Sequence, residues 1–88
     1  MKDHILRRIL TLAATRYGFE PLFGAISSAH AELLTVAGSE EEVLKHLDWL
    51  QDKGLLTTAN EKTSHPGQMQ TYIYLTELGA KISALIEA

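Results

Sequence analysis

The sequence predicts a small α+β domain, mainly helical, with elements in the order helix, helix, helix, strand, strand, helix. Apolar residues recur at helical intervals in three segments before Gly54, and after it the period changes to the alternation of strands. Thr76 then precedes a last segment with helical spacing. The 88 residues are enough for one domain, spanning 1–88, and for no more.

The first two helices are predicted at 3–16 and 21–34. In each segment, apolar residues are spaced three or four positions apart, as on one face of a helix. The pair Tyr17-Gly18 ends the first helix, and Pro21 suits the first turn of the second, where proline is tolerated. The following "TVAG" is predicted to be a turn.

The third helix is predicted at 39–53. Ser39 and Glu42 have the spacing of a capping box, in which the serine oxygen accepts an orphan amide and the glutamate reaches back. Gly54 suits the left-handed conformation that ends many helices. The buried stripe of this helix consists of Val43, Leu47 and Leu50.

A β-hairpin is predicted at about 55–75. "LLTTA" and the alternating "MQTYIYL" form its strands, and "NEKTSHPG" collects turn formers and charges that indicate a loop. The alternation divides the second strand into two faces. One face holds Met69, Thr71, Ile73 and Leu75, and the other holds Gln70, Tyr72 and Tyr74.

The last helix is predicted at 76–87, with Thr76 as its cap. Its apolar side consists of Leu78, Ile82, Leu85 and Ile86. This side either completes the core of a monomer or forms a two-fold homodimer through the terminal helices, because a small core gains from further burial.

Three helices followed by a hairpin resemble a winged helix-turn-helix domain. "VLKHLDWLQDKGLL" is similar to the recognition helix of that family and its turn into the wing, and "TYIYLTELG" resembles the returning wing strand and the start of the closing helix. The block "HLDWLQDKGLL" also resembles small winged-helix proteins encoded in Mu-like bacteriophages. The resemblance implies double-stranded DNA as the partner, with the third helix in the major groove and the wing on the backbone.

The charge of the third helix argues against that partner. Between Ser39 and Lys53, five acidic residues and two lysines give a net charge of −3, which equals the charge of the whole chain. Acidic residues in a first helical turn stabilise the helix by roughly 0.3–1 kcal/mol each, and a glutamate can also accept a hydrogen bond from cytosine in the major groove. The acidic face therefore stabilises the helix, reads a base, docks a basic partner or deters non-specific DNA binding.

The predicted DNA contacts lie on the third helix and the wing. They are Glu41, Leu44, Lys45, His46, Lys62, Ser64, His65 and Gln68. Lys45 points outward on the helical wheel, where it either contacts DNA or forms a solvated ion pair with Glu41. His46 lies at the edge of the buried stripe, so it either contacts DNA or is partly buried, and Trp49 is expected to pack under the wing. The wing either contacts phosphates or is a solvated loop.

Other charged residues carry weaker signals. Arg7, Arg8 and Arg16 form the only basic cluster, and they either skirt the DNA backbone or are solvated. The four histidines show no metal-ligand spacing, and His30 is expected at a helix surface or boundary. "HAE" at 30–32 matches the H-x-E pattern of zinc deaminases, but the chain lacks the cysteine pair that such a site requires. No enzyme, cofactor or metal site is therefore expected.

The cellular location is predicted from absences in the sequence. The chain has no cysteine, no signal peptide, and no apolar run near the roughly 20 residues that a membrane span requires. A cytoplasmic protein that does not enter the membrane is expected. Its function is either that of a DNA-binding transcriptional regulator, or that of a protein-interaction module that uses the acidic face of the third helix and binds no DNA.

Overall fold

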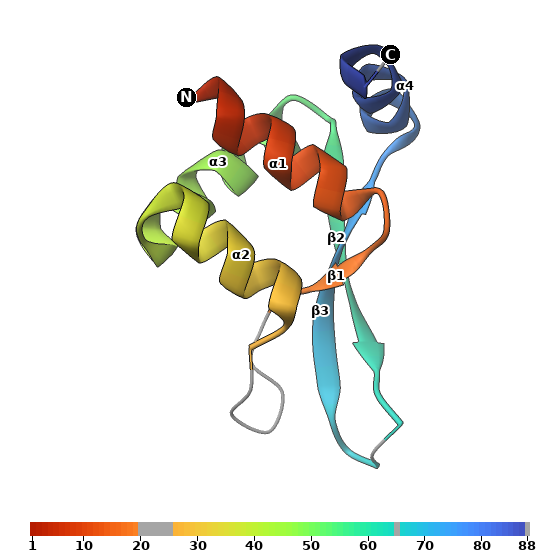
Figure 1. The fold of residues 1–88 in the computed structure, drawn as a ribbon. Coiled ribbons are helices and arrows are strands. Elements are labelled where there is room, and N and C mark those ends of the chain that lie inside the picture. Colours follow the sequence, from red (N-terminus) through yellow and green to blue (C-terminus); the bar gives the residue numbers. More distant parts are fainter. Residues whose placement is uncertain (20–25, 65, 88) are drawn as a thin grey trace.

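The computed structural model describes residues 1–19, 26–64 and 66–87, and its elements confirm the predicted α+β architecture. Three helices lie on one side of the sheet, the hairpin extends past them, and the last helix lies at the opposite end from the hairpin tip (Figure 1). The elements in chain order are α1 (Asp3–Ala13), β1 (Tyr17–Gly18), α2 (Ser28–Ala37), α3 (Glu40–Asp52), β2 (Leu56–Lys62), β3 (Met69–Leu75) and α4 (Glu77–Glu87). None of the helices in these ranges is long and apolar enough to cross a bilayer.

The sheet has a strand that the sequence prediction missed. Tyr17-Gly18 was predicted only to end the first helix, but it forms β1, which pairs antiparallel with β3 and gives the order β1-β3-β2. Tyr17 lies opposite Ile73, and the Phe19 amide donates to the Thr71 carbonyl at 2.8 Å. Two residues are too few to show alternation, so only the partner strand reveals this one.

The first two helices differ from their predicted bounds. α1 ends at Ala13 and not at 16, and Arg16 then adopts a left-handed φ of 55° before β1 begins. α2 begins at Ser28 because the Ser27 side chain caps it, accepting the His30 amide at 3.2 Å. It continues through the predicted turn to Ala37 and ends at Gly38, with φ 94°. The proposed role of Pro21 lies outside the described residues.

The ends of α3 follow the local signals. The Ser39 hydroxyl accepts the Glu42 amide at 3.2 Å, while the Glu42 carboxylate lies 3.7 Å from the Lys45 ammonium. At the other end Gly54 has φ 76°, and the Leu55 amide donates to the Leu50 carbonyl at 3.0 Å, as in a Schellman motif. This motif directs the chain from α3 into β2.

The hairpin is more regular than predicted. β2 continues through Lys62, which pairs with Met69, so "NEK" is strand and not loop. Met69 was predicted on the same face as Ile73, but the two residues differ in burial, with Met69 51% exposed and Ile73 2% exposed. Gln70, on the other face, is only 5% exposed, because its side chain lies over Gly18, where no Cβ intervenes.

The core lies between the helices and the inner face of the sheet. Of its eleven buried hydrophobic residues, α1 contributes four, α3 three and α2 one, and the strands supply the other three. Its hydrophobic members are Ile5, Ile9, Leu10, Ala13, Tyr17, Leu33, Val43, Leu47, Leu50, Leu56 and Ile73.

α4 begins at the predicted cap but buries little of its apolar side. The Thr76 hydroxyl accepts the Gly79 amide at 3.0 Å and lies 2.6 Å from the Gly54 carbonyl oxygen, to which it donates. Leu78, Leu85 and Ile86 are exposed, and Leu85 is 74% exposed. Of the predicted apolar side of α4, Ile82 packs against the core and the other three residues remain exposed.

Candidate nucleic-acid interface

The outer face of α3 presents three of the four predicted helix contacts. Glu41, Leu44 and Lys45 are exposed. The Lys45 ammonium lies 3.8 Å from the Glu41 carboxylate and 3.7 Å from that of Glu42. The lysine charge is therefore shared between two glutamates one turn towards the helix start, as the predicted i, i+4 pair requires.

His46 was predicted to contact DNA, but the structure buries it. Only 1% of its surface is exposed. Its Nδ1 lies 2.6 Å from the Glu42 carbonyl and its Nε2 lies 3.1 Å from the Lys2 amide. Because a carbonyl accepts and an amide donates, Nδ1 carries the proton and Nε2 accepts. His46 thus joins the start of α1 to α3 and is not available on the outer face.

Trp49 lies on the flank of α3 and was expected to pack under the wing. It is 37% exposed, and the Lys53 ammonium lies 5.4 Å from its ring centroid. A cation at this distance from an indole face is attracted by the ring quadrupole. The residue therefore forms a surface pair with Lys53.

The predicted wing contacts are exposed where the structure describes them. Lys62 is a strand residue at the end of β2, Ser64 and Gln68 lie in the loop, and His65 lies outside the described residues. The Thr63 amide donates to the Gln68 carbonyl at 3.1 Å, and Gly67 has a φ of 78° that closes the loop. The hairpin tip and the α3 face are separate parts of the surface, because the tip projects beyond the helices (Figure 1).

The predicted basic cluster is neutralised by acidic partners. Arg7 pairs with Asp3 at 2.8 Å, and Arg8 pairs with Glu32 of α2. Arg16 pairs with Glu61 of β2 at 3.4 Å, and its guanidinium lies 4.1 Å from the centroid of the Tyr72 ring. These arginines are therefore tied to the protein's own surface and add little to a phosphate-binding field.

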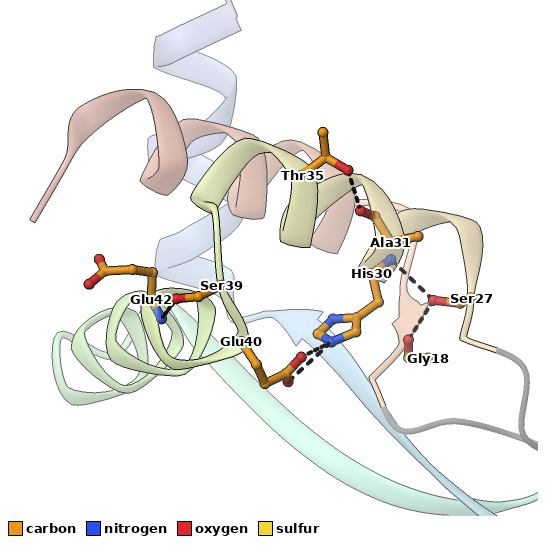
Figure 2. Close-up of polar contacts among 8 residues, drawn as sticks. All are labelled: Gly18, Ser27, His30, Ala31, Thr35, Ser39, Glu40 and Glu42. Atoms are coloured by element: carbon orange, nitrogen blue, oxygen red, sulfur yellow. Dashed lines mark hydrogen bonds and ion pairs between the residues drawn. The ribbon is translucent and has the colours of Figure 1, made fainter.

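A polar cluster around the buried His30 joins α2 to the start of α3. His30 was expected at a surface or boundary, but it is buried, and its Nε2 lies 3.1 Å from the Glu40 carboxylate. Figure 2 shows the imidazole pointing from α2 towards Glu40, with Ser27 between the His30 amide and the Gly18 carbonyl. Burial, and then the Glu40 carboxylate, raise the pKa of the neighbouring Tyr17 hydroxyl above its usual range. The cluster fixes Glu40, so this glutamate has a structural role.

Two carboxylates on α3 are exceptions among the acidic residues. Seven acidic side chains in the described ranges lie within 4.0 Å of a basic group. Asp48 and Asp52, which lie one turn apart and are both exposed, have no such partner among the described residues. The sequence analysis counted their charge but did not distinguish them from the paired glutamates, because pairing is decided in three dimensions.

Metal binding has no support in the described ranges. No group of three or more histidine, cysteine, aspartate or glutamate side chains there is placed to hold a metal ion.

Comparison with known proteins places the fold. No protein-family model matches the sequence, and no curated protein is similar to it in sequence. The crystal structure of smu.1704 from Streptococcus mutans UA159 superposes with a TM-score of 0.67 at 20% identity, over 94% of this chain and 72% of that one. A PadR family transcription regulator from hypervirulent Clostridium difficile R20291 superposes with a TM-score of 0.68 at 14% identity, over 97% of this chain and 84% of that one. The chain therefore has a winged helix-turn-helix fold, similar to that of a PadR family regulator.

Proposed function

We propose that this protein is a DNA-binding winged-helix regulator and not an enzyme, in which α3 enters the major groove and the β2–β3 hairpin lies along the backbone. The observation that supports this best is the exposed outer face of α3, held by the turn after α2 in a domain with a projecting hairpin. Helices in this position read base edges in helix-turn-helix proteins. A cytoplasmic location and a phage origin accompany the proposal as predictions from the sequence.

The charge distribution sets the expected strength of binding. Each protomer offers Lys45 on α3 and Lys62 on the hairpin, while Asp48 and Asp52 repel phosphates from the same helix. Counterion release gives DNA binding its strength in proportion to the number of phosphates that are neutralised. Binding is therefore expected to be weak and restricted to low salt.

We expect binding to mixed duplex DNA at 50 mM salt to weaken roughly 100-fold at 200 mM, if a dimer neutralises about four phosphates. Lys45→Glu should abolish the binding that is measurable at low salt and leave the melting temperature nearly unchanged, because Lys45 is exposed. Fluorescence anisotropy with a labelled duplex measures both effects. Lys2→Glu is the matched control, since it makes the same charge change at an exposed position before α1. Absence of binding at low salt, or equal losses in the two variants, contradicts the proposal.

The proposal includes a homodimer formed through the terminal helices. Leu78, Leu85 and Ile86 leave α4 with an exposed apolar side at the end of the molecule away from the hairpin tip. A two-fold axis at α4 would bury this side against its copy and place two α3 helices for two half-sites.

Light scattering is expected to give about twice the 9.7 kDa mass of the chain at micromolar concentration. Leu85→Glu should return the monomer mass, because it places a charge on the most exposed leucine of α4. Leu44→Glu, at an exposed leucine of α3, is the control and should stay dimeric. A wild-type mass of 9.7 kDa at high concentration would exclude this dimer.

A second candidate function is a protein-interaction module that uses the acidic face of α3 and binds a basic partner. Asp48 and Asp52 favour it, because they are the acidic side chains of α3 that lie within 4.0 Å of no basic group among the described residues. The DNA titration separates the two candidates, since this module requires no affinity for phosphate.

A further inference from the structure

A groove runs between α3 and the inner face of the hairpin. It has a volume of about 210 Å³. Leu47 and Ile73 form its buried floor, and Leu44, which is 42% exposed, forms one wall. Thr58 and Thr71 line the side of the hairpin. An apolar cavity of about 150 Å³ can hold a benzene-sized group, so this groove is large enough for one apolar side chain.

The rim of the groove on α3 is acidic. Asp48 lines it, and Asp52 lies one turn further along the same helix. No lysine or arginine is among the described residues that line the groove. Unlike the paired acids elsewhere, these two carboxylates keep their full charge available to a ligand.

Lys45 of α3 and Lys53, which follows the helix, lie near side chains other than the two carboxylates. At 100° per residue, Leu44 and Gln51 point to the flank of the groove, Trp49 points to the other flank, and Lys45 points outward beside Asp52. The Lys45 ammonium lies near Glu41 and Glu42, and the Lys53 ammonium lies over the Trp49 ring. The groove flank of α3 therefore combines apolar surface with negative charge that the helix does not itself compensate.

We propose that this groove docks a basic segment of a partner protein, with one apolar side chain of the segment on Leu47 and Ile73 and a flanking lysine or arginine on Asp48 and Asp52. The apolar contact supplies affinity, and the two carboxylates select for positive charge. The proposal specifies the site and the partner of the second candidate function, and it does not require that the protein binds DNA.

Charge disfavours other occupants of the groove. Phosphates of DNA would meet the unpaired carboxylate of Asp48 at the rim and that of Asp52 one turn away. A second copy of the chain carries a net charge of −3, so it offers these carboxylates less positive charge than a basic segment does. A basic segment is attracted both by the two carboxylates and by the net negative charge of the chain.

The test uses the full chain and a fluorescein-labelled peptide in which one leucine is flanked by two arginines on each side. We expect saturable binding by anisotropy, and a fivefold to tenfold weaker Kd for the double variant Asp48→Asn, Asp52→Asn, since exposed ion pairs contribute modestly. A peptide with serine in place of the leucine should bind about tenfold more weakly. Asp48→Asn and Asp52→Asn are isosteric changes at exposed positions, so the melting temperature of the double variant should be unchanged.

Glu77→Gln on α4 is the matched control and should leave the peptide Kd within about twofold. Amide chemical shifts are expected to move at Leu44, Thr58 and Thr71 when the peptide is added. The proposal is overturned by absence of saturable binding, by equal affinity of the two peptides, by equal losses in the control and the double variant, or by shifts confined to other surfaces. If the peptide does not bind but salt-sensitive DNA binding is observed, the groove proposal fails and the proposed regulator function is retained. If the peptide binds but DNA does not, the proposed regulator function fails and the groove proposal is retained.

Discussion

Replacing Gly79 by alanine is expected to lower the free energy of unfolding by about 2–3 kcal/mol, although alanine favours helices more than glycine does. A Cβ at this position would overlap the Leu55 carbonyl oxygen. That oxygen accepts the Thr76 amide at 3.1 Å, and the Leu55 amide donates to the Leu50 carbonyl at 3.0 Å. Leu55 is thus fixed on both sides, so α4 must shift to make room for the new methyl group.

Urea unfolding followed by circular dichroism measures this loss. Ala80→Ser adds one heavy atom at the exposed neighbouring position and should change the stability by less than about 0.5 kcal/mol. An alanine at 79 that matches or exceeds the wild type in stability would mean that the first turn of α4 is not packed on Leu55.

Replacing His46 by alanine is expected to lower the free energy of unfolding by about 3 kcal/mol. The substitution empties a fully buried site and removes the acceptor of the Lys2 amide and the donor to the Glu42 carbonyl. The bond from the Lys2 amide connects the start of α1 with α3, and the bond to Glu42 lies within α3. The loss should therefore appear in the global unfolding transition.

His4→Ala is the matched control, because His4 is exposed on α1 and should contribute little to stability. Thermal melting of both variants is to be compared with their DNA binding at a temperature where each is folded. An unchanged melting temperature together with lost DNA binding in His46→Ala would restore His46 as a DNA contact and contradict its interior role.

Much of the fold follows from local signals that act over a few residues. Ser39 caps α3, Gly54 ends it, and Thr76 caps α4, because each satisfies backbone groups that a helix end leaves without partners. The alternation in "MQTYIYL" predicted β3, because successive side chains of a strand point to opposite faces. The start of the second helix was predicted at 21 without regard to Ser27, whose side chain caps α2.

The candidate site depended much more on contacts between distant segments. A helical wheel placed His46 at the edge of the buried stripe of α3. In the folded chain it lies in the interior, where it accepts the amide of Lys2, 44 positions away. The wheel also treated all acids of α3 alike. In the fold, Glu40 contacts His30, and Lys45 lies beside Glu41 and Glu42. Asp48 and Asp52 have no such partner among the described residues.

The sequence by itself determined the order of the elements, the ends of α3, the cap of α4 and the net negative charge of the third helix. Only the tertiary structure decided that Tyr17-Gly18 is a strand, that the arginines are paired, and that an apolar groove with an acidic rim lies beside α3. Capping and periodicity are properties of neighbouring residues. Pairing, burial and the shape of a groove depend on which distant segments the folded chain brings together.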